Sequence, residues 1–118
     1  MAQHKTDVQA QSVGHGNCVL KVRGELTAFA EDQLMAAYNE ACGPGVRNVI
    51  LDFSQLEYMS SSGIGLLVTL LIRAQRQGQR LLACGLTEHY KDIFELTRLN
   101  EAILILNTEA EALAAAAG

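Results

Sequence analysis

Three consecutive hydroxyl side chains, Ser60, Ser61 and Ser62, are the strongest candidates for a functional site in this sequence. They stand before Gly63 and a strongly apolar segment of helical periodicity, so we expect them at a helix N-terminus. One serine there can accept a hydrogen bond from an orphan backbone amide of the first turn. At least one hydroxyl is then left over at the positive end of a helix dipole, where a phosphate group would be stabilised.

The helix expected at residues 62–77 is more apolar than contact with one sheet requires. Its narrow polar arc consists of Gly65, Thr69, Arg73 and Arg76. The apolar arc spans about 240°, whereas a helix lying on a sheet needs only about 100°. Either neighbouring helices bury the excess, or the first turns, including Ile64 and Leu67, form a partner-binding patch beside the serines.

The elements that position this segment alternate between strand and helix patterns. Strand patterns occur at residues 8–12, 19–23, 46–53, 81–84 and 103–106, and helix patterns at 28–41, 62–77, 87–97 and from 109 onward. The first two strands predict an antiparallel hairpin. The whole order predicts an α/β fold, a mixed sheet of about five strands with about four helices packed against it. Because the chain has 118 residues and no linker or repeat, we expect residues 1–118 to form a single domain.

Composition narrows the possible partners. The chain is 49% hydrophobic and carries a net charge of −4, which favours a well-packed core and disfavours nucleic acid or an anionic membrane surface. The longest apolar run, residues 64–72, is far below the roughly 20 residues of a membrane span, so we expect no membrane insertion. Cys18, Cys42 and Cys84 lack metal-ligand spacing and are expected to be free thiols. Together with the polar residues 1–7, which do not resemble a secretory signal, they predict a cytoplasmic location.

Catalysis receives little support from the sequence. No nucleophile elbow surrounds the serines, and His4, His15 and His89 lie in segments with no evident route to a catalytic triad. Asp52 could serve a metal or act as a base, but it more simply closes a buried strand and has no evident acidic partner. We therefore expect no enzyme activity, no metal and no cofactor. A small-ligand or nucleotide-binding module remains an alternative, although residues 63–65 form only a fragment of a dinucleotide fingerprint.

Residues 49–65 resemble the signature segment of the STAS domain family of bacterial anti-sigma factor antagonists. In that family an aspartate-serine-serine/threonine-glycine-x-glycine motif follows a buried strand. Residues 24–26 (glycine-glutamate-leucine) are similar to an early family motif, and residues 84–99 to the family's last third. The resemblance implies a STAS-like domain.

The resemblance also implies a mechanism. It assigns the phospho-acceptor to Ser61, with Ser60, Ser62, Gly63 and Gly65 forming the supporting loop. An unphosphorylated family member binds an anti-sigma factor, often a serine kinase; phosphorylation releases it, and a serine phosphatase restores binding. The candidate partner-binding residues are Glu25, Thr27, Met59, Ile64 and Leu67.

Two positions depart from the family pattern. Ser60 stands where the motif has aspartate, and Thr27 stands where an acidic residue commonly follows the early motif. Both changes remove negative charge beside the expected site. An alternative function is therefore a STAS interaction module without a phosphorylation cycle, in a signalling scaffold or a lipid-transport complex.

Overall fold

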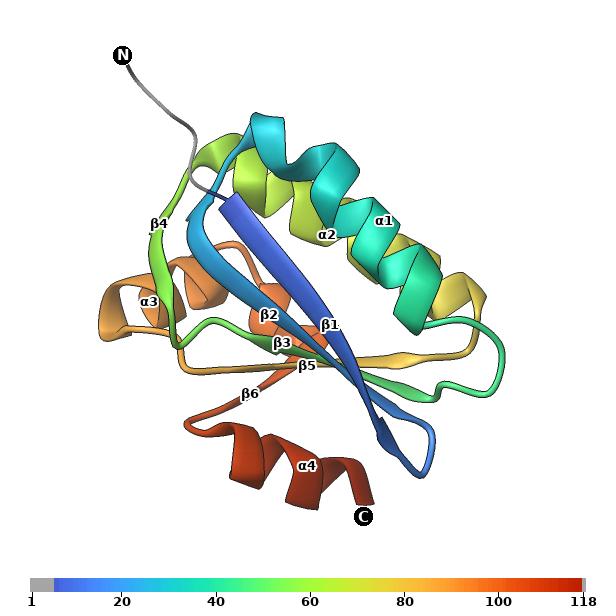
Figure 1. Cartoon of the computed structure of the whole chain (residues 1–118). Coiled ribbons are helices and arrows are strands. Elements are labelled where there is room, and N and C mark those ends of the chain that lie inside the picture. Colours follow the sequence, from blue (N-terminus) through green and yellow to red (C-terminus); the bar gives the residue numbers. More distant parts are fainter. Residues whose placement is uncertain (1–5, 118) are drawn as a thin grey trace.

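A six-stranded mixed sheet forms the centre of the molecule (Figure 1), in a computed structural model that describes residues 6–117. The strands are β1 (Thr6–Gly14), β2 (Asn17–Leu26), β3 (Asn48–Asp52), β4 (Leu56–Met59), β5 (Arg80–Cys84) and β6 (Ile103–Leu106). The helices are α1 (Glu31–Ala41), α2 (Ser61–Arg76), α3 (Glu88–Leu96) and α4 (Glu109–Ala117), with short 3₁₀ helices at Ala28–Ala30 and Leu99–Glu101.

The strand order is β1-β2-β3-β5-β6, with β1 antiparallel to β2 and the other pairs parallel. The predicted hairpin and mixed α/β sheet are confirmed. Strand β4 was not predicted: it pairs with the C-terminal part of β2, beyond the point where the β2–β3 pairing ends. Two of its four residues are exposed, so it lacks the apolar run of a central strand.

Helices cover both faces of the sheet. The larger core contains Tyr38 of α1, Leu70 of α2 and Phe94 of α3. Helix α4 covers the opposite face (Figure 1), where Ala112 packs against a smaller cluster that includes Ile50 of β3.

All three cysteines are buried and free, as predicted. A cap stabilises the start of α4, because the Glu111 amide donates to Thr108 Oγ1 at 3.1 Å and Glu111 Oε1 accepts from the Thr108 amide.

The start of α2 lies directly against the end of β2. The Ser60 amide donates to the Leu26 carbonyl at 3.0 Å. A Cβ atom on Gly63 would stand 2.1 Å from the same carbonyl oxygen. Position 63 must therefore be glycine for the helix to approach this closely.

Asp52, at the end of β3, has an acidic partner that sequence reasoning missed. Burial opposes its ionisation, but the Ser54 amide, which donates to Asp52 Oδ1 at 2.9 Å, favours it. The Ser54 hydroxyl, the Glu109 carboxyl and Lys21 add to this effect and hold the pKa of Asp52 below its ordinary value. Burial, with the hydrogen bond to Asp52, raises the pKa of Glu109. The two carboxyl groups join β3 to the first turn of α4.

Gly63→Ala should destabilise the protein by about 1–3 kcal/mol, because the added methyl group forces α2 away from β2. Gly65→Ala is the matched control, since its Cβ would meet open space. It should stabilise the helix by about 0.5–1 kcal/mol. Urea denaturation measures both changes, and equal effects would contradict the close packing of α2 on Leu26.

Glu109→Gln should change how stability depends on pH. Because the pKa of Glu109 is raised by folding, this group stabilises the fold when protonated, and the contribution is lost as pH rises through the folded-state pKa. The variant keeps a neutral hydrogen-bond donor at all pH values. Its stability relative to wild type should therefore rise between about pH 4 and pH 7. Thermal unfolding across this range measures the trend, and a stability difference that stays constant with pH would contradict the raised pKa of Glu109.

Candidate functional site

The first turn of α2 is built on a cap that Ser60 supplies. Its backbone is extended, and its hydroxyl oxygen accepts a hydrogen bond from the Gly63 amide at 3.1 Å. This is the N-cap arrangement that stabilises a helix start. The sequence predicted one capping serine without saying which, and the structure gives this role to Ser60.

Ser61 and Ser62 are the first two helical residues, and both are exposed. Neither hydroxyl forms a hydrogen bond with any residue from 6 to 117. Both therefore remain available at the positive end of the helix dipole, so exposure alone does not distinguish them.

Helix geometry separates the two serines. Residues three and four positions apart share a helix face. Ser61 therefore lies in line with Ile64, Val68 and Ile72, whereas Ser62 lies above Thr69 and the arginines of the polar arc. Val68 is 39% and Ile72 45% exposed.

The apolar residues of α2 are partly buried and partly exposed. Leu66, Leu67, Leu70 and Ala74 are buried, and Ile64 and Leu71 are partly buried against the core. Val68 and Ile72 remain exposed. We call Ile64, Val68 and Ile72 the apolar stripe; it begins one turn after Ser61.

Glu25 and Thr27 stand beside this turn because β2 ends there. Both side chains are half-buried, and the Thr27 hydroxyl accepts from the Phe29 amide at 3.3 Å, capping the 3₁₀ helix that follows. Two neighbouring aromatic residues were missed by sequence reasoning: Tyr58, paired with Glu25 across β2 and β4, is 51% exposed, and Phe29 is 72% exposed. Tyr58 belongs to β4 and Phe29 to the 3₁₀ helix that follows β2, and both expose a large aromatic side chain.

Met59 and Leu67 do not lie at the surface. Met59 is 4% exposed, and its amide donates to the Tyr90 hydroxyl at 2.8 Å. Leu67 is fully buried in the main core. The structure thus assigns both residues to support of the turn, and the surface beside Ser61 comes from Glu25, Thr27 and Ile64.

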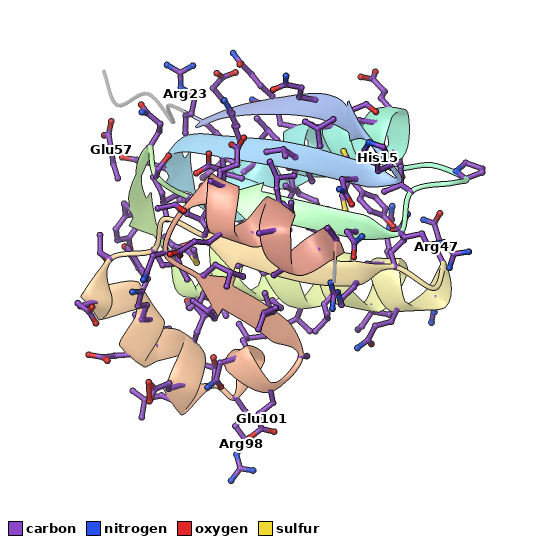
Figure 2. The ribbon with its side chains drawn as sticks, turned by 90° about the horizontal axis from the view of Figure 1, so that it is seen from below. His15, Arg23, Arg47, Glu57, Arg98 and Glu101 are labelled. Atoms are coloured by element: carbon purple, nitrogen blue, oxygen red, sulfur yellow. The ribbon has the colours of Figure 1, made fainter. Side chains whose placement is uncertain are left out.

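The histidines are not gathered near the serines in the part of the chain that is described. His15 lies in the β1–β2 turn, at the end of the molecule opposite Glu57 of β4 (Figure 2). His89 packs edge-on against Tyr90 in α3. His4 falls outside the described residues.

Residues 8–112 match the profile of the STAS domain. The chain belongs to the STAS domain family. BtrV of Bordetella bronchiseptica, which is named as an anti-sigma factor antagonist, is 32% identical over 101 residues, covering 85% of this chain and 86% of BtrV. The anti-sigma-B factor antagonist of Staphylococcus aureus is 27% identical over 82 residues, covering 70% and 76%.

Solved structures confirm the STAS fold. Unphosphorylated SpoIIAA, an anti-sigma factor antagonist, aligns with a TM-score of 0.76 at 24% identity, covering 95% of this chain and 99% of that one. Phosphorylated SpoIIAA of Bacillus aligns with a TM-score of 0.73 at 24% identity, covering 93% and 99%. An anti-sigma factor antagonist from Mycobacterium paratuberculosis aligns at 0.77 and 18% identity, covering 97% and 96%.

Neither a membrane-spanning helix nor a metal-binding cluster occurs within residues 6–117. Within residues 6–117 no helix has the length and apolar character needed to cross a membrane. No group of three or more His, Cys, Asp or Glu side chains in the same range is arranged to hold a metal ion.

Ser60→Ala should lower stability by about 1 kcal/mol, because the Gly63 amide loses its cap. Ser60→Asp should stay within about 0.5 kcal/mol of wild type, since aspartate caps a helix as well as serine does. Ser61→Ala, an exposed change without a lost hydrogen bond, should also stay within about 0.5 kcal/mol. Chemical denaturation tests the three variants together, and an equal loss for both alanine variants would contradict the assignment of the cap to Ser60.

Proposed function

We propose that this protein is an anti-sigma factor antagonist switched by phosphorylation of Ser61. Unphosphorylated, it binds an anti-sigma factor that is itself a serine kinase, and so frees a sigma factor. Phosphorylation of Ser61 ends this binding, and a serine phosphatase restores it. This role would place the protein in the cytoplasm.

The observation that carries the proposal is the position of Ser61. Its hydroxyl is exposed, is not needed for the cap, and heads the apolar stripe of α2. A partner docked on Ile64, Val68 and Ile72 would cover Ser61. Similarity to BtrV and to the Staphylococcus aureus antagonist supports an anti-sigma factor as that partner.

The expected effect of phosphate follows from electrostatics. A phosphoserine adds about −1.5 to −2 charges, which the backbone amides and dipole of a helix N-terminus stabilise. The same charge is costly inside a partly apolar interface, where it loses water without gaining a partner. Binding is therefore lost while the domain stays folded. The STAS fold of SpoIIAA, solved in unphosphorylated and phosphorylated forms, supports this compatibility.

The departures at Ser60 and Thr27 do not remove the framework of the site. Each side chain supplies the capping oxygen that an aspartate would supply. Compared with aspartate, however, both side chains lack a negative charge. This difference favours the alternative function, a STAS interaction module that works without phosphorylation in a scaffold or a lipid-transport complex. Co-purification decides between the two: a kinase supports the switch, and transporter or scaffold subunits without a kinase support the alternative.

Ser61→Ala should abolish phosphorylation by the co-purified kinase, while Ser62→Ala should remain a substrate. Mass spectrometry of the protein after incubation with kinase and ATP locates the phosphate. Phosphate on Ser62, on another residue, or on none would overturn the assignment to Ser61.

Ser61→Asp should weaken binding to the anti-sigma factor by at least about tenfold, since a charge in a desolvated interface costs more than 1.4 kcal/mol. Ser62→Asp is the matched control, because it adds the same charge to the same helix turn on the polar face. Isothermal titration calorimetry should show a smaller loss of affinity for Ser62→Asp than for Ser61→Asp. Unchanged affinity of the Ser61→Asp variant would place the interface away from this turn, and equal losses for the two variants would contradict an interface on the Ser61 face. Unchanged melting temperatures of both variants would exclude unfolding as the cause.

A further inference from the structure

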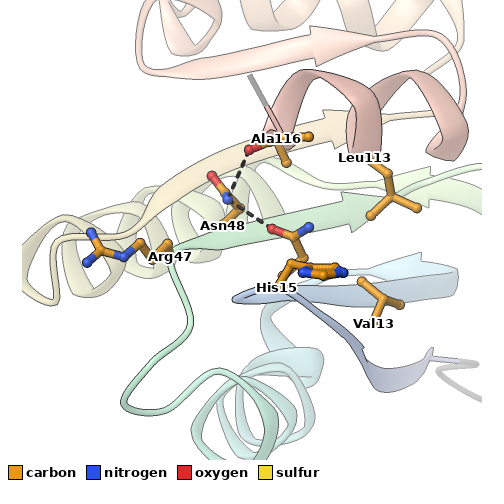
Figure 3. A pocket seen from close by; sticks show the side chains of 8 residues that line it. Val13, His15, Arg47, Asn48, Leu113 and Ala116 are labelled. Carbon is orange, nitrogen blue, oxygen red and sulfur yellow. Dashed lines mark hydrogen bonds between the residues drawn. The ribbon is translucent and has the colours of Figure 1, made fainter.

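The largest cavity of the described chain lies at the end of the molecule opposite the phosphorylation site. It has a volume of about 700 Å³ and opens between the β1–β2 turn, the start of β3 and the last turn of α4 (Figure 3). Binding sites for small organic molecules commonly have this size. Figure 2 shows two of its lining residues, His15 and Arg47, far from Glu57 of β4.

The side-chain amide of Asn17 supplies a hydrogen-bond donor at the cavity. Asn17 is only 9% exposed and lines the cavity. Its Oδ1 accepts a hydrogen bond from Asn48 Nδ2 at 2.9 Å (Figure 3), whereas its own Nδ2 group has no acceptor among residues 6–117. No side-chain nitrogen or oxygen that is buried in the described part of the chain lacks a partner, so Nδ2 is open to the cavity and can donate to a bound ligand atom.

The other polar groups at the cavity also favour an anion. Arg47, at the rim, forms neither an ion pair nor a side-chain hydrogen bond with residues 6–117. His15 also lines the cavity, and its φ of 56° is the conformation that a two-residue β-hairpin turn requires. No acidic side chain is among the residues that line the cavity.

The remaining wall is apolar. Val13 of the hairpin faces Leu113 and Ala116 of α4 across the cavity (Figure 3), and the two α4 residues also pack against the smaller core. Two of the last carbonyl groups of α4 accept hydrogen bonds, which reduces the repulsion of an anion by the negative end of the helix dipole. The carbonyl of Ala115 accepts from Arg80 Nη2 at 2.9 Å and that of Ala116 from Asn48 Nδ2 at 3.4 Å.

We propose that this cavity binds a small organic oxyanion with an apolar body. The Asn17 amide group donates to an anionic oxygen, the flexible Arg47 side chain closes over the anion from the rim, and the apolar body lies against Val13 and Leu113. Arginine suits both a carboxylate and a phosphate monoester. The site is independent of Ser61, so its failure would leave the proposed switch untouched.

The test uses 2-naphthoate, 2-naphthyl phosphate and the neutral 2-naphthalenemethanol, titrated into the full chain and followed by ¹H–¹⁵N NMR. At least one anion should bind more tightly than the neutral compound, with shifts confined to residues near 13–17, 47–48 and 112–117. The tighter of the two anions identifies the headgroup. No saturable shifts up to about 5 mM, equal binding of the neutral compound, or shifts centred elsewhere would overturn the proposal.

Arg47→Gln should weaken binding of the preferred anion about fivefold while barely changing that of the neutral compound, because one charge-assisted contact is lost. Arg98→Gln, an exposed change that Figure 2 shows far from His15 and Arg47, is the control and should leave both affinities unchanged. If both variants weakened anion binding equally, the net charge of the protein alone would explain the attraction of the anion, and the proposed site would be overturned.

Discussion

The close approach of α2 to the end of β2 is the contact on which the candidate site depends. Gly63 lies against the carbonyl oxygen of Leu26 with no room for a Cβ atom, and the same carbonyl accepts a hydrogen bond from Ser60. This packing fixes where the helix begins and which way its first turn faces. It also places the end of β2, with Glu25 and Thr27, beside the exposed serines.

The two residues that depart from the family pattern both occupy caps. Ser60 caps α2 and Thr27 caps the 3₁₀ helix after β2. Serine and threonine can replace an acidic residue in this role because the cap needs an oxygen acceptor and not a full charge. The local backbone is thus preserved while the charge around Ser61 is reduced. A partner kinase that recognises this protein must therefore read a less acidic surface than the family motif provides.

The sequence predicted the hairpin, the mixed sheet, the four helices and the serine-rich helix start, because each has a strong local pattern. It missed β4, whose four residues form a strand only because the end of β2 offers free backbone groups. It also missed the pairing of Asp52 with Glu109, which lie 57 positions apart in the chain and meet only when α4 covers the sheet. The burial of Met59 and Leu67 depends in the same way on tertiary packing.

The two ends of the molecule offer different chemistry. One end carries Ser61, the apolar stripe and exposed aromatic residues, which suit a protein partner. The other carries a cavity of about 700 Å³ that is lined by Asn17 and Arg47. At the first end, a phosphate on Ser61 should decide whether the partner binds.

The most direct measurement compares the protein bearing phosphoserine at position 61, installed during translation, with the unmodified chain. Calorimetric titration against the same anti-sigma factor should show at least about a hundredfold loss of affinity, while the melting temperatures agree within a few degrees. Equal affinities of the two forms would contradict the account.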